Sequence, residues 1–183
     1  SLGVYEIVRR MVTEIKSLSN ELSEYDKVSV MLAGLLHDVG HGPFSHAFEH
    51  VTNHSHEDYT VKIILGNTEL NSVLSKVSKN LPHDIVAIIQ HTHKNDILNQ
   101  IVSGQLDADR MDYLLRDSYF TATSYGQFDL ERILRTMRVR KIDDDKKQLV
   151  VKYTGIHSVE DYIMARYQMY WQVYYHPVAR SYE

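Results

Sequence analysis

The sequence predicts a predominantly α-helical protein that carries one small β-hairpin near residues 138–153. Apolar residues recur at intervals of three and four over most of the chain, which is the period of helices with one buried face. Alternation of apolar and polar residues surrounds one charged turn, which is typical of a hairpin. Glycine and proline, which interrupt helices, number only 8 and 3 among 183 residues. This length suits one domain, and we expect residues 1–183 to form a single one.

The composition narrows the classes of function. The chain has no cysteine, which excludes disulfides, thiolate zinc sites and a cysteine nucleophile, and we expect a cytoplasmic location. The formal net charge of −4 disfavours broad, sequence-independent binding of nucleic acids. No apolar run approaches the ~18 residues of a membrane span, so we expect no membrane partner. The unusual feature is the 11 histidines, several of which cluster in residues 37–56.

Two helices are expected at the start of the chain. In residues 1–18, apolar side chains fall at helical spacing, which predicts an amphipathic helix. Asp26 is a candidate N-cap for a second helix over residues 27–38, which is apolar almost all round and is therefore expected near the centre of the fold. Gly40 and Pro43 should end this helix.

Shorter elements follow. Ser55 and Asp58 resemble a capping box that opens a helix through Leu65. Segments 139–142 and 149–153, on either side of the charged turn at 143–147, are the expected strands of the hairpin. The other expected helices cover residues 45–51, 69–78, 82–91, 95–103, 107–118, 129–137 and a tyrosine-rich final segment, 158–175.

The densest group of polar side chains lies at the end of the second expected helix. His37 and His41 are four residues apart, on one helix face, and Asp38 is turned ~100° from His37. Imidazole and carboxylate together form a mixed nitrogen and oxygen ligand set that suits Mg, Mn, Fe, Co, Ni or Zn. A simpler interpretation is a polar pair that stabilises a helix end. A second acidic cluster downstream favours a metal site, with Asp109 as the best candidate for a distant ligand.

Three stretches carry a resemblance to a known family. They are His37-Asp38 with residues 40–46 (GHGPFSH), then His56-Glu57, then residues 107–113 (DADRMDY). Together they resemble the HD-domain phosphohydrolases, most closely the deoxynucleoside triphosphate triphosphohydrolase branch. The resemblance spans nearly the whole chain and implies the all-α helical fold of that family.

The resemblance implies a divalent metal ion as cofactor (Mg, Mn, Fe, Co, Ni or Zn). Its protein ligands carry over to His37, Asp38 and Asp109. In the family, a further ligand histidine precedes a Ser-Leu-Gly-Val string, and this chain begins with that string at Ser1. We therefore expect the chain to start one residue after that ligand, as a fragment of a longer polypeptide.

The resemblance also implies catalytic residues. His46, with Glu49 to orient it, matches a pair that lies beside the scissile α-phosphate, where an imidazole can protonate the departing 5′ oxygen. His41, His56 and Glu57 match further active-site groups that contact phosphate or the attacking water. The alternative for each of these histidines, taken alone, is a surface or capping residue.

Substrate contacts carry over in the same way. Arg110 and Arg166 match cations that bind phosphate, Tyr113 matches an aromatic residue against the sugar, and Asp117 matches a carboxylate at the 3′ hydroxyl. Tyr174 matches a tyrosine that crowds the 2′ position. The alternative is that the tyrosines of the last helix form an aromatic face that packs against the core or a partner subunit.

The activity that the resemblance implies is hydrolysis of deoxynucleoside triphosphates to deoxynucleoside and tripolyphosphate. Two alternatives stay open: an HD-type nucleotidase or phosphodiesterase, and a non-catalytic nucleotide-binding module. The resemblance also implies a homo-oligomer, either a dimer or a tetramer, with an allosteric nucleotide near Arg138 and Lys152 in the hairpin. Solvated strand charges are an equally good interpretation of those two cations.

Overall fold

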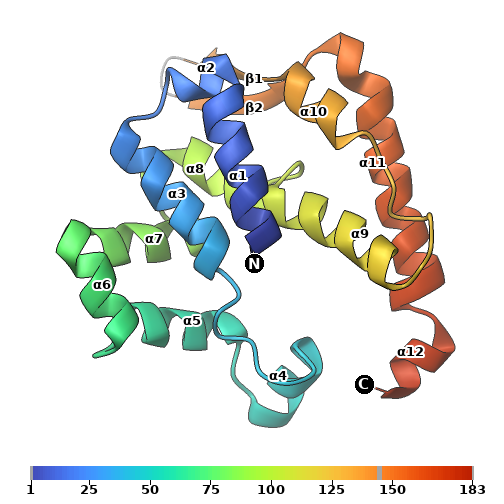
Figure 1. Cartoon of the computed structure of the whole chain (residues 1–183), viewed down its shortest axis with the longest axis horizontal. Coiled ribbons are helices and arrows are strands. Elements are labelled where there is room, and N and C mark those ends of the chain that lie inside the picture. The colour runs from blue at the N-terminus through green and yellow to red at the C-terminus, as the bar shows by residue number, and fades with distance from the viewer. Residues whose placement is uncertain (1, 144–145, 183) are drawn as a thin grey trace.

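The computed structural model describes residues 2–143 and 146–182, and its helices and single antiparallel hairpin confirm the expected fold class (Figure 1). The first helices are α1 (Leu2–Glu14), α2 (Lys16–Ser19), α3 (Glu24–Leu36), α4 (His46–Thr52), α5 (His56–Leu65), α6 (Glu69–Val77) and α7 (Leu81–Ile89). They are followed by α8 (Asp96–Ser103), α9 (Ala108–Phe120), α10 (Leu130–Thr136), β1 (Met137–Asp143), β2 (Lys146–Val151), η1 (Tyr153–Gly155), α11 (Ile156–Met169), η2 (Tyr170–Tyr174) and α12 (Pro177–Tyr182). Among the described residues, no helix is both long and apolar enough to cross a membrane.

Helix α1 buries the apolar stripe that its sequence predicts and packs against α3 and α9. The expected single helix over residues 1–18 is wrong, because the backbone of Ile15 is extended and separates α1 from α2. Ile15 and Leu18 are nevertheless both buried. The break turns α2 beneath the hairpin, where the hydroxyl of Ser17 accepts a hydrogen bond from the backbone N–H of Val139 at 3.1 Å.

Helix α3 begins earlier and ends earlier than expected. Ser23, and not Asp26, is its N-cap, and Asp26 completes a capping box in which each residue accepts a hydrogen bond from the other's backbone N–H at 3.1 Å. The last regular residue is Leu36, so His37 and Asp38 lie at the helix end. In α5, Ser55 caps through the N–H of Glu57, and the expected reciprocal bond with Asp58 does not form.

Gly3 allows the start of α1 to lie directly on α9. A Cβ at this position would fall 1.8 Å from a carboxylate oxygen of Asp112, which is itself largely buried. The start of α1 therefore lies beside α9, close to the end of α3 (Figure 1). Three segments that are distant in sequence meet at this point.

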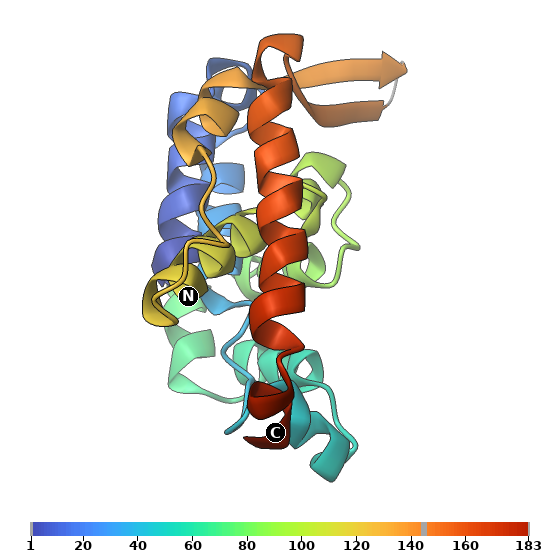
Figure 2. The same ribbon diagram turned by 90° about the vertical axis from the view of Figure 1, so that its right-hand side faces the viewer.

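The hairpin projects from one end of the helical body (Figure 2). Its strands pair Val139 with Leu149 in antiparallel register, and the N–H of Leu149 donates to the side chain of Gln100 at 3.0 Å. Both strands start earlier than expected, and Tyr153 lies in a 3₁₀ turn and not in a strand. Residues 144–145 of the expected turn lie outside the described residues.

Helix α11 runs along the side of the molecule and continues into η2, a π-helical segment (Figure 2). The expected helix over 158–175 is thus regular only from Ile156 to Met169, and α12 was not expected. Tyr162 is buried and Tyr174 packs against the core, whereas Tyr167 and Tyr175 are exposed. The tyrosines of this helix therefore do not form one face.

Candidate active site

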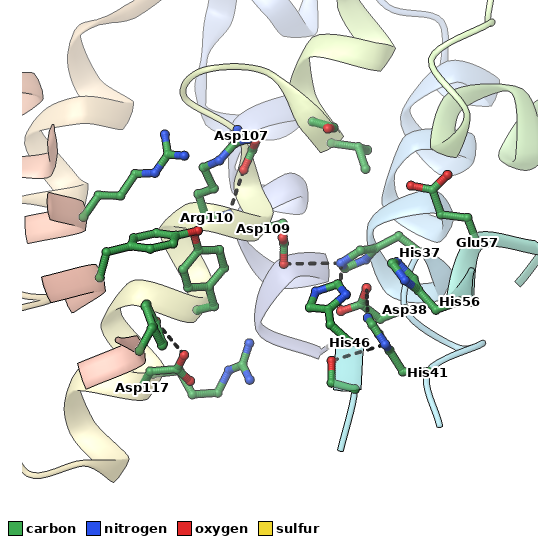
Figure 3. A pocket seen from close by; sticks show the side chains of 18 of the residues that line it. His37, Asp38, His41, His46, His56, Glu57, Asp107, Asp109, Arg110 and Asp117 are labelled. Atoms are coloured by element: carbon green, nitrogen blue, oxygen red, sulfur yellow. Dashed lines mark hydrogen bonds and ion pairs between the residues drawn. The ribbon is translucent and has the colours of Figure 1, made fainter. Parts of the chain in front are cut away.

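A cleft of about 1100 Å³ lies between the end of α3, the loop and helices that follow it, α9 and the α11–η2 segment. Figure 3 shows the histidines on one side of it and Asp107, Arg110 and Asp117 of the α9 region on the other, with Asp109 between them. Most residues expected at the site line this cleft. They are His37, Asp38, His41, His46, His56, Glu57, Asp109, Arg110, Tyr113, Asp117, Arg166 and Tyr174.

The three expected metal ligands converge at the end of α3. The Nδ1–H group of His37 donates to the carbonyl oxygen of Gly34 at 2.9 Å, which turns Nε2 toward the cleft. Nε2 lies 3.1 Å from Oδ2 of Asp38 and 3.3 Å from Oδ1 of Asp109. One atom from each of the three side chains lies within 4.8 Å of the other two, which is close enough to share one ion.

The charges at this point favour a cation. Burial disfavours the charged imidazole of His37, but the hydrogen bonds to Asp109 and Asp38 outweigh burial and raise its pKa to about 10. Burial likewise opposes the ionised form of Asp38, yet contact with His37 holds the pKa of its carboxyl below the ordinary value. An oriented imidazole nitrogen between two carboxylates is a donor set that fits a divalent metal of the transition series or, with water, Mg²⁺.

A second group of side chains adjoins the first through Asp38. Nε2 of His41 lies 3.5 Å from Oδ1 of Asp38, and its ring stacks on that of His56 with centroids 3.8 Å apart. Glu49 accepts a hydrogen bond from the backbone N–H of His56 at 3.0 Å and contacts the ring of His56 with the same oxygen. Its other oxygen lies 3.4 Å from Nδ1 of His46, whose side chain is 71% exposed.

Glu49 thus contacts two histidines, whereas the prediction from the sequence was that it orients His46 alone. The backbone and ring hydrogen bonds from His56 lower the pKa of the Glu49 carboxyl to about 2. Glu49 itself does not line the cleft. It lies behind the two imidazoles and orients them.

The loop between α3 and α4 has two features that were not predicted from the sequence. Phe44 and Ser45 have φ angles of 63° and 51°, a strained region for residues other than glycine. The buried Thr60 of α5 donates to the carbonyl oxygen of His37 at 3.1 Å and accepts from the N–H of Gly40 at 3.0 Å. Thr60 thereby fixes the start of α5 to the end of α3.

The opposite wall of the cleft is built by α9 and the last helices. The hydroxyl of Tyr174 donates to Asp117 at 2.7 Å, and burial, followed by this contact, raises the pKa of Tyr174. The guanidinium of Arg166 lies over the ring of Tyr170, 5.7 Å from its centroid. Tyr113 is half-buried beside Tyr174, with ring centroids 6.2 Å apart.

Further residues line the cleft beside those predicted to bind the metal or the substrate. His91 lines the cleft with a φ of 57°, outside the helix expected to include it, and Arg116 and Arg180 add two cations. Asp107 caps α9, and burial raises its pKa to about 6. The sequence signal for this cap is the aspartate at the start of an expected helix, whose carboxylate accepts a hydrogen bond from the backbone N–H three residues later.

Arg138 and Lys152 lie outside this cleft, at the base of the hairpin. Arg138 donates to the carbonyl oxygen of Arg135 at 2.9 Å. Nη1 of Arg138 also donates to the carbonyl oxygen of Met137. Their separation from the cleft distinguishes them from the other expected site residues.

Comparisons with known proteins agree with the geometry. A family model described as HD domain matches residues 1–117, and one described as HD associated region matches residues 128–183. The YwfO protein of Bacillus subtilis (strain 168) is 56% identical over 183 residues, which cover 100% of this chain and 41% of YwfO. The deoxynucleoside triphosphate triphosphohydrolase SAMHD1 homolog of Dictyostelium discoideum is 31% identical over 198 residues, which cover 100% of this chain and 37% of that protein.

A solved structure extends the comparison to three dimensions. The crystal structure of a phosphohydrolase from Bacteroides thetaiotaomicron matches with a TM-score of 0.83 and 34% identity, over 99% of this chain and 42% of that one. The chain thus spans about two fifths of the length of each of these relatives.

Proposed function

Because the chain belongs to the HD-domain family, we propose that it forms the catalytic part of a metal-dependent phosphohydrolase that converts deoxynucleoside triphosphates to deoxynucleoside and tripolyphosphate. One observation carries this proposal. His37, Asp38 and Asp109 converge within 4.8 Å in a cleft that also presents Arg110 and Arg166. The named activity of the Dictyostelium relative supports the choice of substrate.

In this proposal, His37, Asp38 and Asp109 hold a divalent metal ion. When bound there, such an ion polarises phosphoryl oxygens and lowers the pKa of water. His37 suits the role because its Nδ1–H group is held by the carbonyl oxygen of Gly34, so that Nε2 points toward the two carboxylates, where a metal ion would take the place of its proton. The chemistry of the donor set leaves the identity of the metal open among Mg, Mn, Fe, Co, Ni and Zn.

The protein's own residues supply the proton and the orientation. Water attacks the α-phosphorus, the bond to the 5′ oxygen breaks, and His46 donates the proton that this oxygen takes up. The exposure of His46 to the cleft suits this role, and Glu49 orients both His46 and His56. His41, His56 and Glu57 line the same side, where they would contact the phosphate or the attacking water.

The opposite wall binds the nucleotide. Arg110 and Arg166 would bind the phosphates, and Tyr113 would lie against the sugar. The Tyr174–Asp117 hydrogen bond places a hydroxyl and a carboxylate together, where Asp117 would accept from the 3′ hydroxyl and Tyr174 would crowd the 2′ position.

The remaining features of the proposal concern the whole protein. Residues 1–183 act as one domain of a cytoplasmic homo-oligomer, and the cations Arg138 and Lys152 bind an allosteric nucleotide away from the cleft. The separation of these two residues from the cleft is the observation that favours a regulatory role for them over a catalytic one.

The test is product analysis with the complete polypeptide. Each deoxynucleoside triphosphate is incubated with the protein and a divalent metal, and the nucleoside and the inorganic products are separated by chromatography. We expect equal amounts of deoxynucleoside and tripolyphosphate, with activity abolished in Asp38→Asn and retained in Asp58→Asn, an exposed carboxylate outside the cleft.

Other products would favour the alternatives. Turnover of monophosphates or cyclic dinucleotides in place of triphosphates indicates a nucleotidase or phosphodiesterase. Nucleotide binding without any product indicates a non-catalytic binding module.

A further inference from the structure

The side chain of Asp107 is buried between the start of α9 and Arg110. The residue is only 2% exposed, and both of its carboxylate oxygens are occupied by Arg110. Oδ1 accepts a hydrogen bond from the backbone N–H of Arg110 at 2.7 Å, which caps α9, and Oδ2 accepts from its guanidinium nitrogen Nη1. One carboxylate therefore fixes both the backbone and the side chain of the same residue.

In the described part of the chain, the protein binds the guanidinium of Arg110 only through the nitrogen Nη1. Nη1 also donates to the carbonyl oxygen of Gly104, so both of its hydrogens are used by the protein. Within the ranges that the structure describes, Nη2 and Nε have no hydrogen-bond partner. These two groups form the fork that binds two phosphate oxygens at once, and Arg110 lines the cleft.

The chain contains an internal comparison for this arrangement. Asp129 caps α10 as Asp107 caps α9, and it accepts a hydrogen bond from the backbone N–H of Arg132 at 2.8 Å. The guanidinium of Arg132, however, donates to the carbonyl oxygen of Thr154 at 2.9 Å and not to Asp129. An N-cap aspartate three residues before an arginine therefore does not by itself fix the arginine side chain.

We propose that Asp107 is a positioning residue, which holds Arg110 so that Nη2 and Nε face the phosphates before the nucleotide arrives. This inference rests on the proposed function, in which Arg110 binds the substrate. A side chain that is already ordered loses less conformational entropy when the ligand binds. Loss of the Asp107 contact should therefore weaken binding of the phosphates and leave the chemical step largely intact.

The test replaces Asp107 with serine in the complete polypeptide. Serine is a good N-cap but too short to reach the guanidinium, so α9 should remain capped. We expect Asp107→Ser to raise KM for a deoxynucleoside triphosphate by about threefold to tenfold and to change kcat by less than about twofold. Asp129→Ser, the matched change of an N-cap remote from the cleft, should change neither constant.

The double variant shows whether Asp107 acts through Arg110. In an Arg110→Ala background, Asp107→Ser should raise KM no further. The proposal is overturned if Asp107→Ser leaves KM unchanged, if Asp129→Ser raises KM equally, or if the increase persists without Arg110. If Asp107→Ser does not fold, Asp107→Asn retains an acceptor for the cap and is measured in its place, with Asp129→Asn as its control.

Binding of inorganic tripolyphosphate separates this inference from the proposed function. If the wild-type protein hydrolyses no deoxynucleoside triphosphate, the proposed function fails, and calorimetric titration with tripolyphosphate then decides the role of Asp107. Binding that is at least about threefold weaker in Asp107→Ser than in Asp129→Ser supports the inference. Equal binding by the two variants, or no binding by the wild-type protein, overturns it.

Discussion

Replacing Gly40 with alanine should separate the end of α3 from the start of α5 and disturb the site between them. A Cβ at residue 40 would lie 2.2 Å from the carbonyl oxygen of His56 and 2.4 Å from the backbone nitrogen of Thr60. Both neighbours are backbone atoms, so neither can rotate away as a side chain could. Ordinary contact requires a displacement of roughly 1 Å, which the two segments must share.

The size of the effect follows from this displacement. Overpacking of this kind costs about 1–3 kcal/mol of the free energy of unfolding, or a fall in melting temperature of about 2–10 °C for a chain of this length. Displacement of catalytic groups by about 1 Å can lower a rate by about 100-fold. His56 and the His37-Asp38 pair lie on opposite sides of the contact, so we expect activity to fall by about that factor.

Thermal unfolding and steady-state turnover of the complete polypeptide test this prediction. Gly34→Ala, in the last part of α3, is the matched control, because its Cβ would meet only side-chain atoms, at 3.0 Å for Val8 and 3.5 Å for Val4. It should change the free energy of unfolding by less than about 1 kcal/mol and leave the Gly34 carbonyl oxygen bound to His37. A Gly40→Ala protein with the melting temperature and turnover of the control would refute the reasoning.

Three further predictions concern groups that build the site. Thr60→Val leaves the backbone groups of His37 and Gly40 without their buried partner and should lower the free energy of unfolding by about 1–3 kcal/mol in urea, whereas Thr60→Ser should retain most of it. Glu49 has a pKa of about 2 in the folded protein, below its ordinary value of 4.5, so its contribution to stability is present above pH 4.5 and is lost as the pH falls toward 2. Melting temperatures between pH 2 and 6 should therefore fall less steeply for Glu49→Gln than for the wild-type protein, and parallel profiles would contradict this assignment. Asp109→Asn removes one of the carboxylates around Nε2 of His37 and should lower the metal bound per chain at least tenfold, as measured by mass spectrometry of the purified protein, while Asp58→Asn should match the wild type.

The helical class, the hairpin and the cluster at the end of α3 could be predicted because each is a local pattern. The apolar stripe of α1 continues at helical spacing through Leu18, and for the same reason the break at Ile15 could not be seen. Ile15 and Leu18 are buried whether or not the helix continues. The break is fixed by a tertiary contact, the hydrogen bond from Val139 to Ser17.

The positions of the site residues depend on contacts that sequence spacing does not encode. Glu49 was expected to orient His46, three residues before it, but it also accepts two hydrogen bonds from His56, seven residues after it. With the same spacing of aspartate and arginine, the side chain of Arg110 binds the aspartate, whereas that of Arg132 binds the carbonyl oxygen of Thr154. Local pattern identifies the groups, and packing decides which of them meet.

The carboxylate of Asp38 connects the two groups of side chains in the cleft. Its Oδ2 faces His37, which belongs to the metal-binding set, and its Oδ1 faces His41, which stacks on His56. Asp38 can face both because α3 ends at Leu36, and the turn through Gly40 then brings α5 against the helix end. A change that moves α5 alone must therefore alter the surroundings of Asp38 as well. For this reason the Gly40→Ala variant should lose bound metal together with activity, although Gly40 has no side chain in the site.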